Sequence, residues 1–355
     1  MSSSTTEPSV WVTILAGGVG SRFWPVSTPT RPKQLLPLAG DRPLIAETLD
    51  RARRLVSDDR IRILAGADLT ERFRAALPDL PGTAYLVEPA ARGTAPVLAW
   101  AAWTLLREDP DACMVSLHAD HEVDPEEAFA ARILEAVELA QRERLLVTIG
   151  VEPDRPETGY GYIQPGAALP GPVRGAARVA AFHEKPDAET AARYLDDGFL
   201  WNTGIFVWRA DVLLEEIRTH APEVARALPR LETGDVPGFF EACVPVTVDV
   251  AVLERSERVA VLTATFRWDD VGSWASLPRT RPGDEAGNVA VGRLTAVDSR
   301  DNVVFAEGGA VVLFGVADLI VVRTDDVTFV THRDRAPELK SLVAALPPNL
   351  QDPKA

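Results

Sequence analysis

A short apolar run that ends in a glycine-rich turn constrains the fold of this chain more than any other feature. Residues 10–16 read VWVTILA, and Gly17, Gly18 and Gly20 follow. An apolar run of this length bounded by glycines is typical of a buried strand. Glycine has no Cβ, so the turn can bend sharply and bring its N–H groups close to an anion. The pattern predicts an anion-binding turn at the carboxyl end of a strand.

These glycines fit two common nucleotide-binding patterns poorly. No Gly-Lys-Ser/Thr follows them, which excludes a P-loop, and the third glycine of the dinucleotide fingerprint is displaced. A Pro-rich loop comes where the dinucleotide fold would begin a helix. Positive charge is supplied by Arg22 and then by Lys33. We therefore expect a phosphate-binding loop of another kind.

Strands and helices alternate through the first 150 residues. Apolar spacing predicts helices over 44–56, 95–106 and 125–142, and strands over 61–65, 113–117 and 145–150. This alternation predicts an α/β fold, with a Rossmann-like, mostly parallel mixed sheet and helices on both faces. Ligands of such sheets bind beyond the carboxyl ends of the strands.

The sequence changes in character near residue 288. Short β-like runs separated by Gly, Asp and Asn follow, and a helix is predicted only over 337–346. This predicts a small C-terminal all-β appendage, similar to a β-helix. We expect a catalytic domain over 9–282 and a second domain over 286–348.

Net charge limits the partners of the chain. It carries 52 acidic and 37 basic residues, a formal charge of -15. Such a surface repels nucleic acid and anionic membranes, so we expect neither as a partner. No apolar stretch reaches the ~18 residues that span a bilayer, and residues 1–8 lack a signal-peptide pattern, so we expect a cytoplasmic protein. Cys113 and Cys243 are expected to be buried thiols.

Residues 15–38, LAGGVGSRFWPVSTPTRPKQLLPL, resemble the signature of the sugar nucleotidyltransferases, in particular the mannose-1-phosphate guanylyltransferases. The resemblance implies a loop that wraps a triphosphate and its base, with Arg22 and Lys33 on the phosphates. Trp24 and Gln34 match the guanylyltransferase version. The loop residues expected to bind nucleotide are Leu15, Ala16, Gly17, Gly18, Gly20 and Ser21.

A second segment, Glu88-Pro89 with Arg92-Gly93-Thr94-Ala95-Pro96, resembles the family's E-P-x-x-R-N-T-A-P, which lies against the base. A carboxylate can accept hydrogen bonds from guanine N1–H and N2–H₂, which adenine and the pyrimidines cannot reproduce. Glu88 is therefore a candidate guanine reader, with Arg92 and Thr94 beside it; the alternative is an exposed loop carboxylate. Gly93 stands where the family usually has Asn, so no side-chain role carries over there.

Two acidic motifs point to a metal. Leu117-His118-Ala119-Asp120-His121 resembles L-P-A-D-H, with His118 in place of Pro, and residues 268–274 resemble W-x-D-V-G. An Asp at the end of a buried strand can hold Mg²⁺ beside substrate phosphates. The resemblance assigns Mg²⁺ to Asp120 and Asp270 and leaves Asp269 in a variable slot. We expect His121 to have a structural role rather than a catalytic or metal-binding one.

Three further motifs, TGYGYI, FHEKP and WNTGIF, resemble the family's sugar site. The resemblance implies that Glu184 binds sugar hydroxyls and Lys185 the sugar phosphate. Asn202 can both donate to and accept from hydroxyls. Asp249, in a motif similar to S-I-D-Y-A-V-L-E, receives no role. The expected sugar-phosphate site is Gly159, Tyr160, Glu184, Lys185, Asn202 and Thr203.

The resemblance carried by these motifs implies a reaction of GTP with α-D-mannose 1-phosphate that gives GDP-mannose and pyrophosphate. Mg²⁺ is the expected cofactor, and Arg22, Lys33 and Lys185 are the expected catalytic cations. The resemblance also implies a homodimer, because the β appendage fits the short β-structure that these enzymes often use to dimerise. One alternative is the same chemistry on another base or on another sugar phosphate, such as a heptose. A second is a non-catalytic homologue that binds nucleotide sugars. A third, a dinucleotide-dependent oxidoreductase, is disfavoured by the glycine spacing.

Overall fold

The computed structural model describes residues 9–18 and 20–352. The signal-peptide expectation for residues 1–8, and Val19 of the glycine turn, lie outside this range. The chain forms two compact units. The first comprises residues up to Ala16, Asp50–His118 and Val123–Trp268, and the second comprises Gly17–Leu49, Ala119–Glu122 and the residues from Asp269 onward.

The first unit is built on a nine-stranded sheet in the order β3-β2-β1-β4-β9-β6-β10-β8-β7. The four strands β3, β2, β1 and β4 are parallel, as are β6 and β10. The strands are β1 (Val10–Leu15), β2 (Ile61–Gly66), β3 (Tyr85–Glu88), β4 (Cys113–His118), β6 (Leu146–Val151), β7 (Gly161–Ala168), β8 (Ala176–Glu184), β9 (Leu200–Arg209) and β10 (Val259–Thr263). The predicted strands of the first 150 residues are confirmed.

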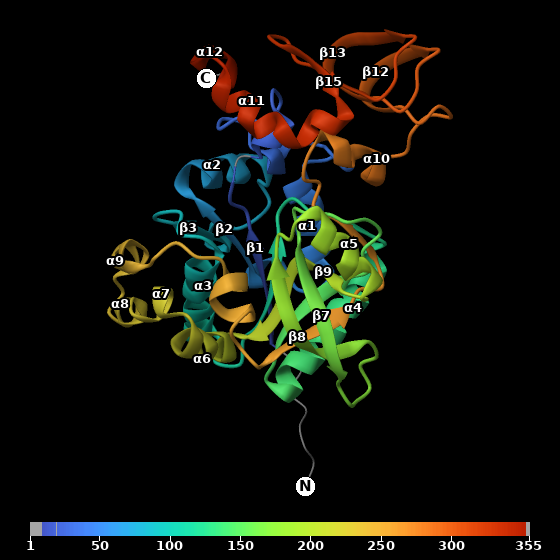
Figure 1. Cartoon of the computed structure of the whole chain (residues 1–355). Coiled ribbons are helices and arrows are strands. Elements are labelled where there is room, and N and C mark those ends of the chain that lie inside the picture. The colour runs from blue at the N-terminus through green and yellow to red at the C-terminus, as the bar shows by residue number, and fades with distance from the viewer. Residues whose placement is uncertain (1–8, 19, 353–355) are drawn as a thin grey trace. The chain divides into compact units, whose positions relative to one another are not determined.

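Two strands, β9 and β8, run opposite to the parallel strands of this sheet. β9 lies between β4 and β6 and is antiparallel to both, and β8 is antiparallel to β10. The alternation in the sequence predicts strands and helices, but it does not show this insertion. The sheet is therefore mixed, with its parallel half at the N-terminal strands (Figure 1).

Helices cover both faces of this sheet. α3 (Thr94–Glu108) and α6 (Ala210–His220) share a core with Trp11, Met114 and Trp208. α4 (Glu126–Glu143) packs against β4, β6 and β9, and its residues lie outside that core. The predicted helices are thus confirmed within two or three residues, including α1 (Leu44–Arg53). The other helices of this unit are α2 (Ala67–Ala76), α5 (Ala188–Asp196), α7 (Pro222–Ala225), α8 (Leu228–Glu232) and α9 (Val236–Ala242), with a π-helical turn at Asp249–Leu253.

The second unit contains the predicted all-β appendage. β12 (Val289–Val297), β13 (Val303–Phe314) and β14 (Leu319–Arg323) are parallel, and β15 (Thr328–His332) is antiparallel to β14. α11 (Leu339–Ala345) and α12 (Pro348–Gln351) follow (Figure 1). Two asparagines stabilise the coil between strands, because Asn302 Nδ2 donates to Asn288 Oδ1 at 2.8 Å.

The glycine-rich loop shares its core with this β sheet. Phe23, Trp24 and Leu36 belong to one buried cluster with Trp274 and Phe329. Short elements complete this region: 3₁₀ turns at Ser21–Phe23 (η1), Lys33–Leu35 (η2), Trp274–Ser276 (η6) and Arg333–Glu338 (η7), and α10 (Leu277–Thr280). β5 (Glu122–Asp124) and β11 (Arg267–Asp269) pair as a separate two-stranded sheet.

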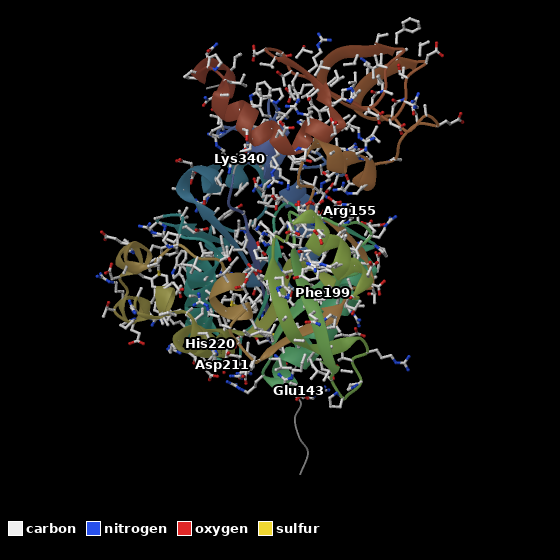
Figure 2. All side chains as sticks on the ribbon, viewed as in Figure 1. Glu143, Arg155, Phe199, Asp211, His220 and Lys340 are labelled. Carbon is white, nitrogen blue, oxygen red and sulfur yellow. The ribbon has the colours of Figure 1, made fainter. Side chains whose placement is uncertain are left out.

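Charged side chains lie over the surface of both units (Figure 2). Within the described residues, no helix is both long enough and apolar enough to cross a membrane.

Candidate active site

The glycine turn begins where β1 ends. All six residues of β1 are buried, whereas Gly17 and Gly18 are exposed. Gly18 and Gly20 have φ of 86° and 76°, the left-handed region that favours glycine. A Cβ on Gly20 would lie 2.4 Å from the Cβ of Lys33, so a larger residue does not fit. Gln34 Nε2 donates to the carbonyl oxygens of Gly17 and Gly18 at 3.0 and 3.3 Å and holds the turn closed.

Two cations extend from this loop in different settings. Arg22 is exposed in the middle of η1, and its Nη1 donates to the Gly272 carbonyl oxygen at 3.4 Å. Lys33 is only 6% exposed. Its Nζ lies 3.0 Å from Asp120 Oδ2 and donates to the Asp270 carbonyl oxygen at 2.8 Å. The second unit therefore brings together three site residues that the sequence places far apart.

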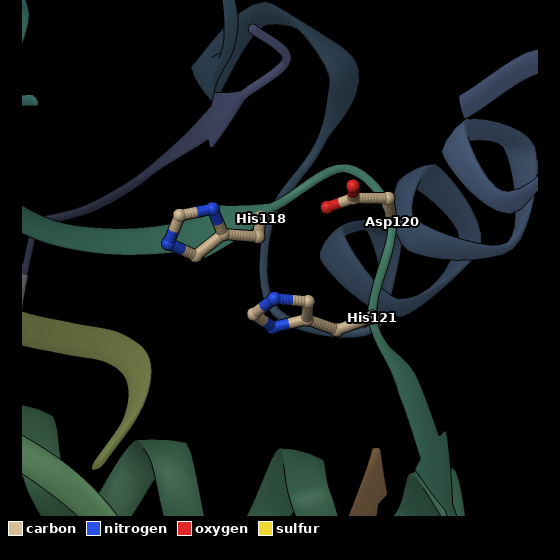
Figure 3. Close-up of side chains that lie close together, drawn as sticks. All are labelled: His118, Asp120 and His121. Atoms are coloured by element: carbon tan, nitrogen blue, oxygen red, sulfur yellow. The ribbon is translucent and has the colours of Figure 1, made fainter. Parts of the chain in front are cut away.

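The turn after β4 presents the first candidate metal ligand. β4 ends at His118, and Asp120 and His121 project from the turn that follows (Figure 3). The Asp120 side chain is 21% exposed, so its carboxylate combines the ion pair to Lys33 with access to solvent. A carboxylate in this position can bind a ligand or a metal ion without being fully desolvated.

A strained turn presents the second candidate ligand, Asp270. Val271 has φ of 46°, which is rare for a β-branched residue. The buried Asp269 holds this turn: its Oδ1 accepts the Val271 N–H at 2.8 Å, and its Oδ2 accepts Arg279 Nε at 2.5 Å. A Cβ on Gly272 would lie 2.7 Å from Asp270 Oδ2. Sequence reasoning gave Asp269 no task, although the doubled Asp before Val-Gly was a visible signal.

The chemistry of these groups fits a hard divalent cation. Asp120 and Asp270 offer carboxylate oxygens, which are the ligands that Mg²⁺ prefers. The Lys33 ammonium lies against the Asp120 carboxylate and the Asp270 carbonyl, so a positive charge is already stabilised there. A metal ion and two carboxylates would leave little net charge beside a triphosphate.

In the first unit, Glu88 ends β3. Burial raises the pKa of this carboxyl from 4.5 to about 7. Near neutral pH it therefore exists in both protonation states. Such a group can accept hydrogen bonds from a ligand whose N–H groups favour the ionised form.

The residues after Glu88 are tied to a neighbouring segment. Arg92 Nε donates to the Phe240 carbonyl oxygen at 3.0 Å, and the Thr94 hydroxyl accepts the Val248 N–H at 2.9 Å. Gly93 has φ of 85°, and a Cβ there would lie 2.4 Å from the Val246 carbonyl oxygen. This close approach explains why glycine occupies the place where the family usually has Asn. Arg92 and Thr94 thus have structural partners in addition to any contact with a base.

Asn202 lies at the centre of a polar network on β9. Its Oδ1 accepts the Thr148 hydroxyl at 3.0 Å and the Gly204 N–H at 3.3 Å. Its Nδ2 donates to Asp249 Oδ1 at 2.8 Å. Burial and the negative charge of Glu184 raise the pKa of Asp249 to about 6. Asp249, which received no role from the sequence, therefore lies close enough to Glu184 for the two carboxylates to interact electrostatically.

Glu184 is the last residue of β8, and Lys185 follows it. The two side chains form an ion pair, and the Lys185 side chain is 62% exposed. Lys185 has φ of 48°, and its N–H donates to the Tyr160 carbonyl oxygen at 3.2 Å. The Tyr160 ring packs edge to face on Trp201, with centroids 5.1 Å apart. The guanidinium carbon of Arg155, a residue labelled in Figure 2, lies 4.7 Å from the centroid of that Trp201 ring, so a cation adjoins the aromatic pair.

Two residues expected at the sugar site, Thr203 and Gly159, have hydrogen-bond partners within the protein. The Thr203 hydroxyl is buried and donates to the Ile149 carbonyl oxygen at 2.8 Å, so its side chain supports the sheet. Gly159 is exposed, and its N–H donates to Glu157 Oε1 at 3.1 Å. Glu184, Lys185, Asn202 and Asp249 form the electrostatically connected group of the first unit.

Family models match nearly the whole chain. The model described as Nucleotidyl transferase matches residues 12–286. The chain belongs to the nucleotidyl transferase family. A second model, the MannoseP isomerase/GMP-like beta-helix domain, matches residues 292–346 of this nucleotidyl transferase. The alternative of a dinucleotide-dependent oxidoreductase is therefore wrong.

Two named relatives and one crystal structure match this chain over most of its length. The alginate biosynthesis protein AlgA of Pseudomonas putida is 37% identical over 349 residues, covering 94% of this chain and 70% of AlgA. The mannose-1-phosphate guanylyltransferase ManC of Salmonella typhimurium is 34% identical over 357 residues, covering 95% and 73%. A crystal structure described as mannose-1-phosphate geranyltransferase from Thermus thermophilus has a TM-score of 0.87 at 33% identity, covering 94% of this chain and 98% of that one. The nucleotidyl transferase is thus of the kind that uses nucleoside triphosphates and sugar phosphates.

Proposed function

We propose that this nucleotidyl transferase transfers GMP from GTP to α-D-mannose 1-phosphate, releasing pyrophosphate. The observation that carries the proposal is the contact of one buried ammonium, Lys33, with both acidic segments, at Asp120 Oδ2 and at the Asp270 carbonyl oxygen. Lys33 packs directly against Gly20 of the loop, where a Cβ would lie 2.4 Å from the Lys33 Cβ, so only glycine fits beside this lysine. The relatives at about one-third identity include a protein named mannose-1-phosphate guanylyltransferase.

The proposal assigns Mg²⁺ to the carboxylates of Asp120 and Asp270. When bound, the ion would neutralise charge on the triphosphate and polarise its phosphoryl oxygens. Asp269 keeps the Asp270 turn in place through its bond to the Val271 N–H. Lys33 pairs with the Asp120 carboxylate before the substrates bind.

The chemistry assigned to the cations needs no general base. The attacking group is an oxygen of the sugar phosphate, which is already an anion. The barrier lies in bringing two anions together and in stabilising the charge that develops during in-line attack at the α-phosphorus. Arg22 and Lys33 are assigned to the triphosphate, and Lys185 is assigned to the sugar phosphate. An acidic protein can bind both ligands because these cations are placed locally.

Base recognition is assigned to Glu88. In its ionised form the carboxylate accepts two hydrogen bonds, which match guanine N1–H and N2–H₂. Its pKa of about 7 allows guanine binding to shift it toward that form. Adenine offers no equivalent pair of donors, so the proposal predicts a preference for GTP.

Sugar recognition is assigned to the network around Asn202. The Asn202 Oδ1 already accepts two hydrogen bonds, and its Nδ2 uses one of two N–H groups on Asp249. The second N–H can donate to a sugar hydroxyl, while Glu184 and Asp249 can accept from others. This arrangement favours a ligand with several neighbouring hydroxyls.

A homodimer is a further part of the proposal. Val312 and Phe314 of β13 are 69% and 74% exposed, and Val297 of β12 pairs with Phe314 in register. Exposed apolar side chains that gather on one sheet often mark an interface. Light scattering of the purified chain tests this assignment: twice the mass of 38.4 kDa is expected, and a monomer would contradict it.

A substrate panel tests the proposed function. The chain is incubated with Mg²⁺, one of GTP, ATP, UTP or dTTP, and mannose 1-phosphate, glucose 1-phosphate or a heptose 1-phosphate. Pyrophosphate release should be fastest for GTP with mannose 1-phosphate. Faster release with another pair would move the assignment to that base or sugar. Tight GDP-mannose binding without release from any pair would support the non-catalytic alternative.

A further inference from the structure

Trp24, two residues after Arg22, is anchored to the far end of the chain. Its side chain is 5% exposed, and its Nε1–H donates to the Leu350 carbonyl oxygen at 2.8 Å. Its ring meets Phe329 edge to face, with centroids 5.4 Å apart. A buried indole needs an acceptor for its N–H, and here α12 supplies it.

The backbone beside Trp24 is held from a second side. Trp274 Nε1 donates to the Trp24 carbonyl oxygen at 3.0 Å, and Phe23 packs edge to face on the Trp274 ring at 5.0 Å. α11 packs against η1, the turn that carries Arg22. The two aromatic residues after Arg22 are therefore both built into the core of the second unit.

Two residues of the segment between Arg22 and Lys33 make further contacts within the second unit. The Thr30 hydroxyl donates to Asp352 Oδ1 at 3.3 Å, just beyond α12. Arg31 forms an ion pair with Glu307 of β13. The loop is thus attached to the C-terminal segment at Trp24 and Thr30, and to the β sheet at Arg31.

Arg22 depends on these attachments more than Lys33 does. Its guanidinium is exposed, and its hydrogen bond to the Gly272 carbonyl oxygen is long, at 3.4 Å. Lys33 is buried and has short contacts to Asp120 and to the Asp270 carbonyl oxygen. The position of Arg22 therefore follows from the position of its backbone.

We propose that Trp24 is a positioning residue and that Leu339–Asp352 is a strap that holds the nucleotide loop ready for a triphosphate. This inference rests on the proposed function, because it assumes that Arg22 contacts phosphate. It gives the C-terminal segment a task in catalysis within one chain, separate from any pairing of two copies. The strap stabilises the Arg22 turn in the free protein, so less order has to be gained on binding.

Two variants of the full chain test the strap. Trp24→Phe keeps an aromatic ring near Phe329 and loses the N–H donor. Leu350→Pro removes the Leu350 N–H bond to the Pro347 carbonyl oxygen and opens the turn that places the acceptor. Each variant should raise KM for GTP about five- to tenfold, the effect of one lost buried hydrogen bond, with a smaller change in kcat. Amide hydrogen exchange over residues 20–24 should become faster in both.

A double variant and a control variant distinguish the loss of the Trp24–Leu350 hydrogen bond from general damage to the fold. If the two residues act through one bond, Trp24→Phe with Leu350→Pro should be no worse than the more severe single variant. Lys340→Ala, exposed on α11 of the same strap (Figure 2), should change neither KM nor exchange. If Trp24→Phe fails to fold by circular dichroism, Leu350→Pro alone carries the comparison with Lys340→Ala.

The outcomes distinguish the two proposals. Unchanged KM and unchanged exchange in the folded variants would overturn the strap, as would fully additive effects. Faster exchange over residues 20–24 together with weaker GTP binding, in a protein that turns over no triphosphate, would support the strap and contradict the proposed transfer reaction.

Discussion

The Lys33 Nζ lies 3.0 Å from Asp120 Oδ2 and 2.8 Å from the Asp270 carbonyl oxygen. One buried ammonium therefore joins the glycine-rich loop to both acidic segments of the second unit. The proposed reaction depends on this relationship, because the charge that pairs with the Asp120 carboxylate can also contact a phosphate.

Replacing Lys33 with Ala should lower kcat about 10²- to 10³-fold, because a preorganised electrostatic contact is lost. Pyrophosphate release measures the rate, and circular dichroism shows whether the variant is folded. Lys340→Ala, which removes an exposed cation of the same unit, should keep the rate of the parent chain. A folded Lys33→Ala protein with a near-normal rate would show that the ammonium has no part in catalysis.

Replacing Asp269 with Ala should destabilise the protein by about 2–4 kcal/mol, because the Val271 N–H and the Arg279 guanidinium lose a buried acceptor. The Asp270 turn should loosen, so the Mg²⁺ concentration for half-maximal rate should rise. Urea unfolding and a Mg²⁺ titration measure the two effects.

The exposed carboxylate of Asp41, which pairs with Arg281, provides the control for Asp269. Asp41 is 97% exposed in its side chain, so Asp41→Ala should cost less than about 1 kcal/mol and leave the Mg²⁺ response unchanged. Equal effects of the two substitutions would contradict a positioning role for Asp269.

Glu88 should make both stability and nucleotide binding depend on pH. Its pKa is raised from 4.5 to about 7, so the folded protein binds more protons than the unfolded chain between these values. Its contribution to stability is therefore complete below about pH 4.5 and is lost as pH rises through about 7. KM for GTP should rise as pH falls below about 7, because the protonated carboxyl no longer offers two free acceptors.

Glu88→Gln should remove the pH dependence that Glu88 contributes to stability and to KM for GTP. Urea unfolding and KM for GTP, each measured from pH 5 to 8, test this. If the variant keeps the profile of the parent chain, another group is responsible and Glu88 does not read the base.

Asn202→Ala should raise KM for mannose 1-phosphate about tenfold, because a donor to the sugar and the bond to Asp249 are both lost. KM for GTP should stay within twofold of the parent value. The neighbouring Thr203→Val removes the hydroxyl that donates to the Ile149 carbonyl oxygen, so it should lower stability by about 1 kcal/mol and leave both KM values unchanged. A Thr203→Val variant with weakened sugar-phosphate binding would instead place that hydroxyl at the sugar.

Local patterns predicted the elements of this fold well. β1, β2 and β4 are six-residue strands built mainly of apolar residues, and the sequence shows them directly. The antiparallel insertion of β9 between β4 and β6 could not be seen, because periodicity indicates that a strand exists and not which neighbours it has.

The candidate site likewise contains residues that the sequence identifies and residues whose roles only the structure shows. Arg22, Lys33, Asp120 and Asp270 stand in motifs whose spacing could be recognised. The tasks of Asp269 and Trp24 depend on partners that only the folded chain supplies, Arg279 and the Leu350 carbonyl oxygen. The placement of the loop in the core of the β appendage could not be predicted for the same reason.

The most direct measurement of the central claim is Mg²⁺-dependent pyrophosphate release from GTP and mannose 1-phosphate by the parent chain and by Asp120→Ala and Asp270→Ala. Release should require Mg²⁺, and each substitution should lower kcat at least 10²- to 10³-fold while the protein stays folded. Rapid release without a divalent cation, or near-normal rates in both folded variants, would contradict the assignment of these two carboxylates to a catalytic metal.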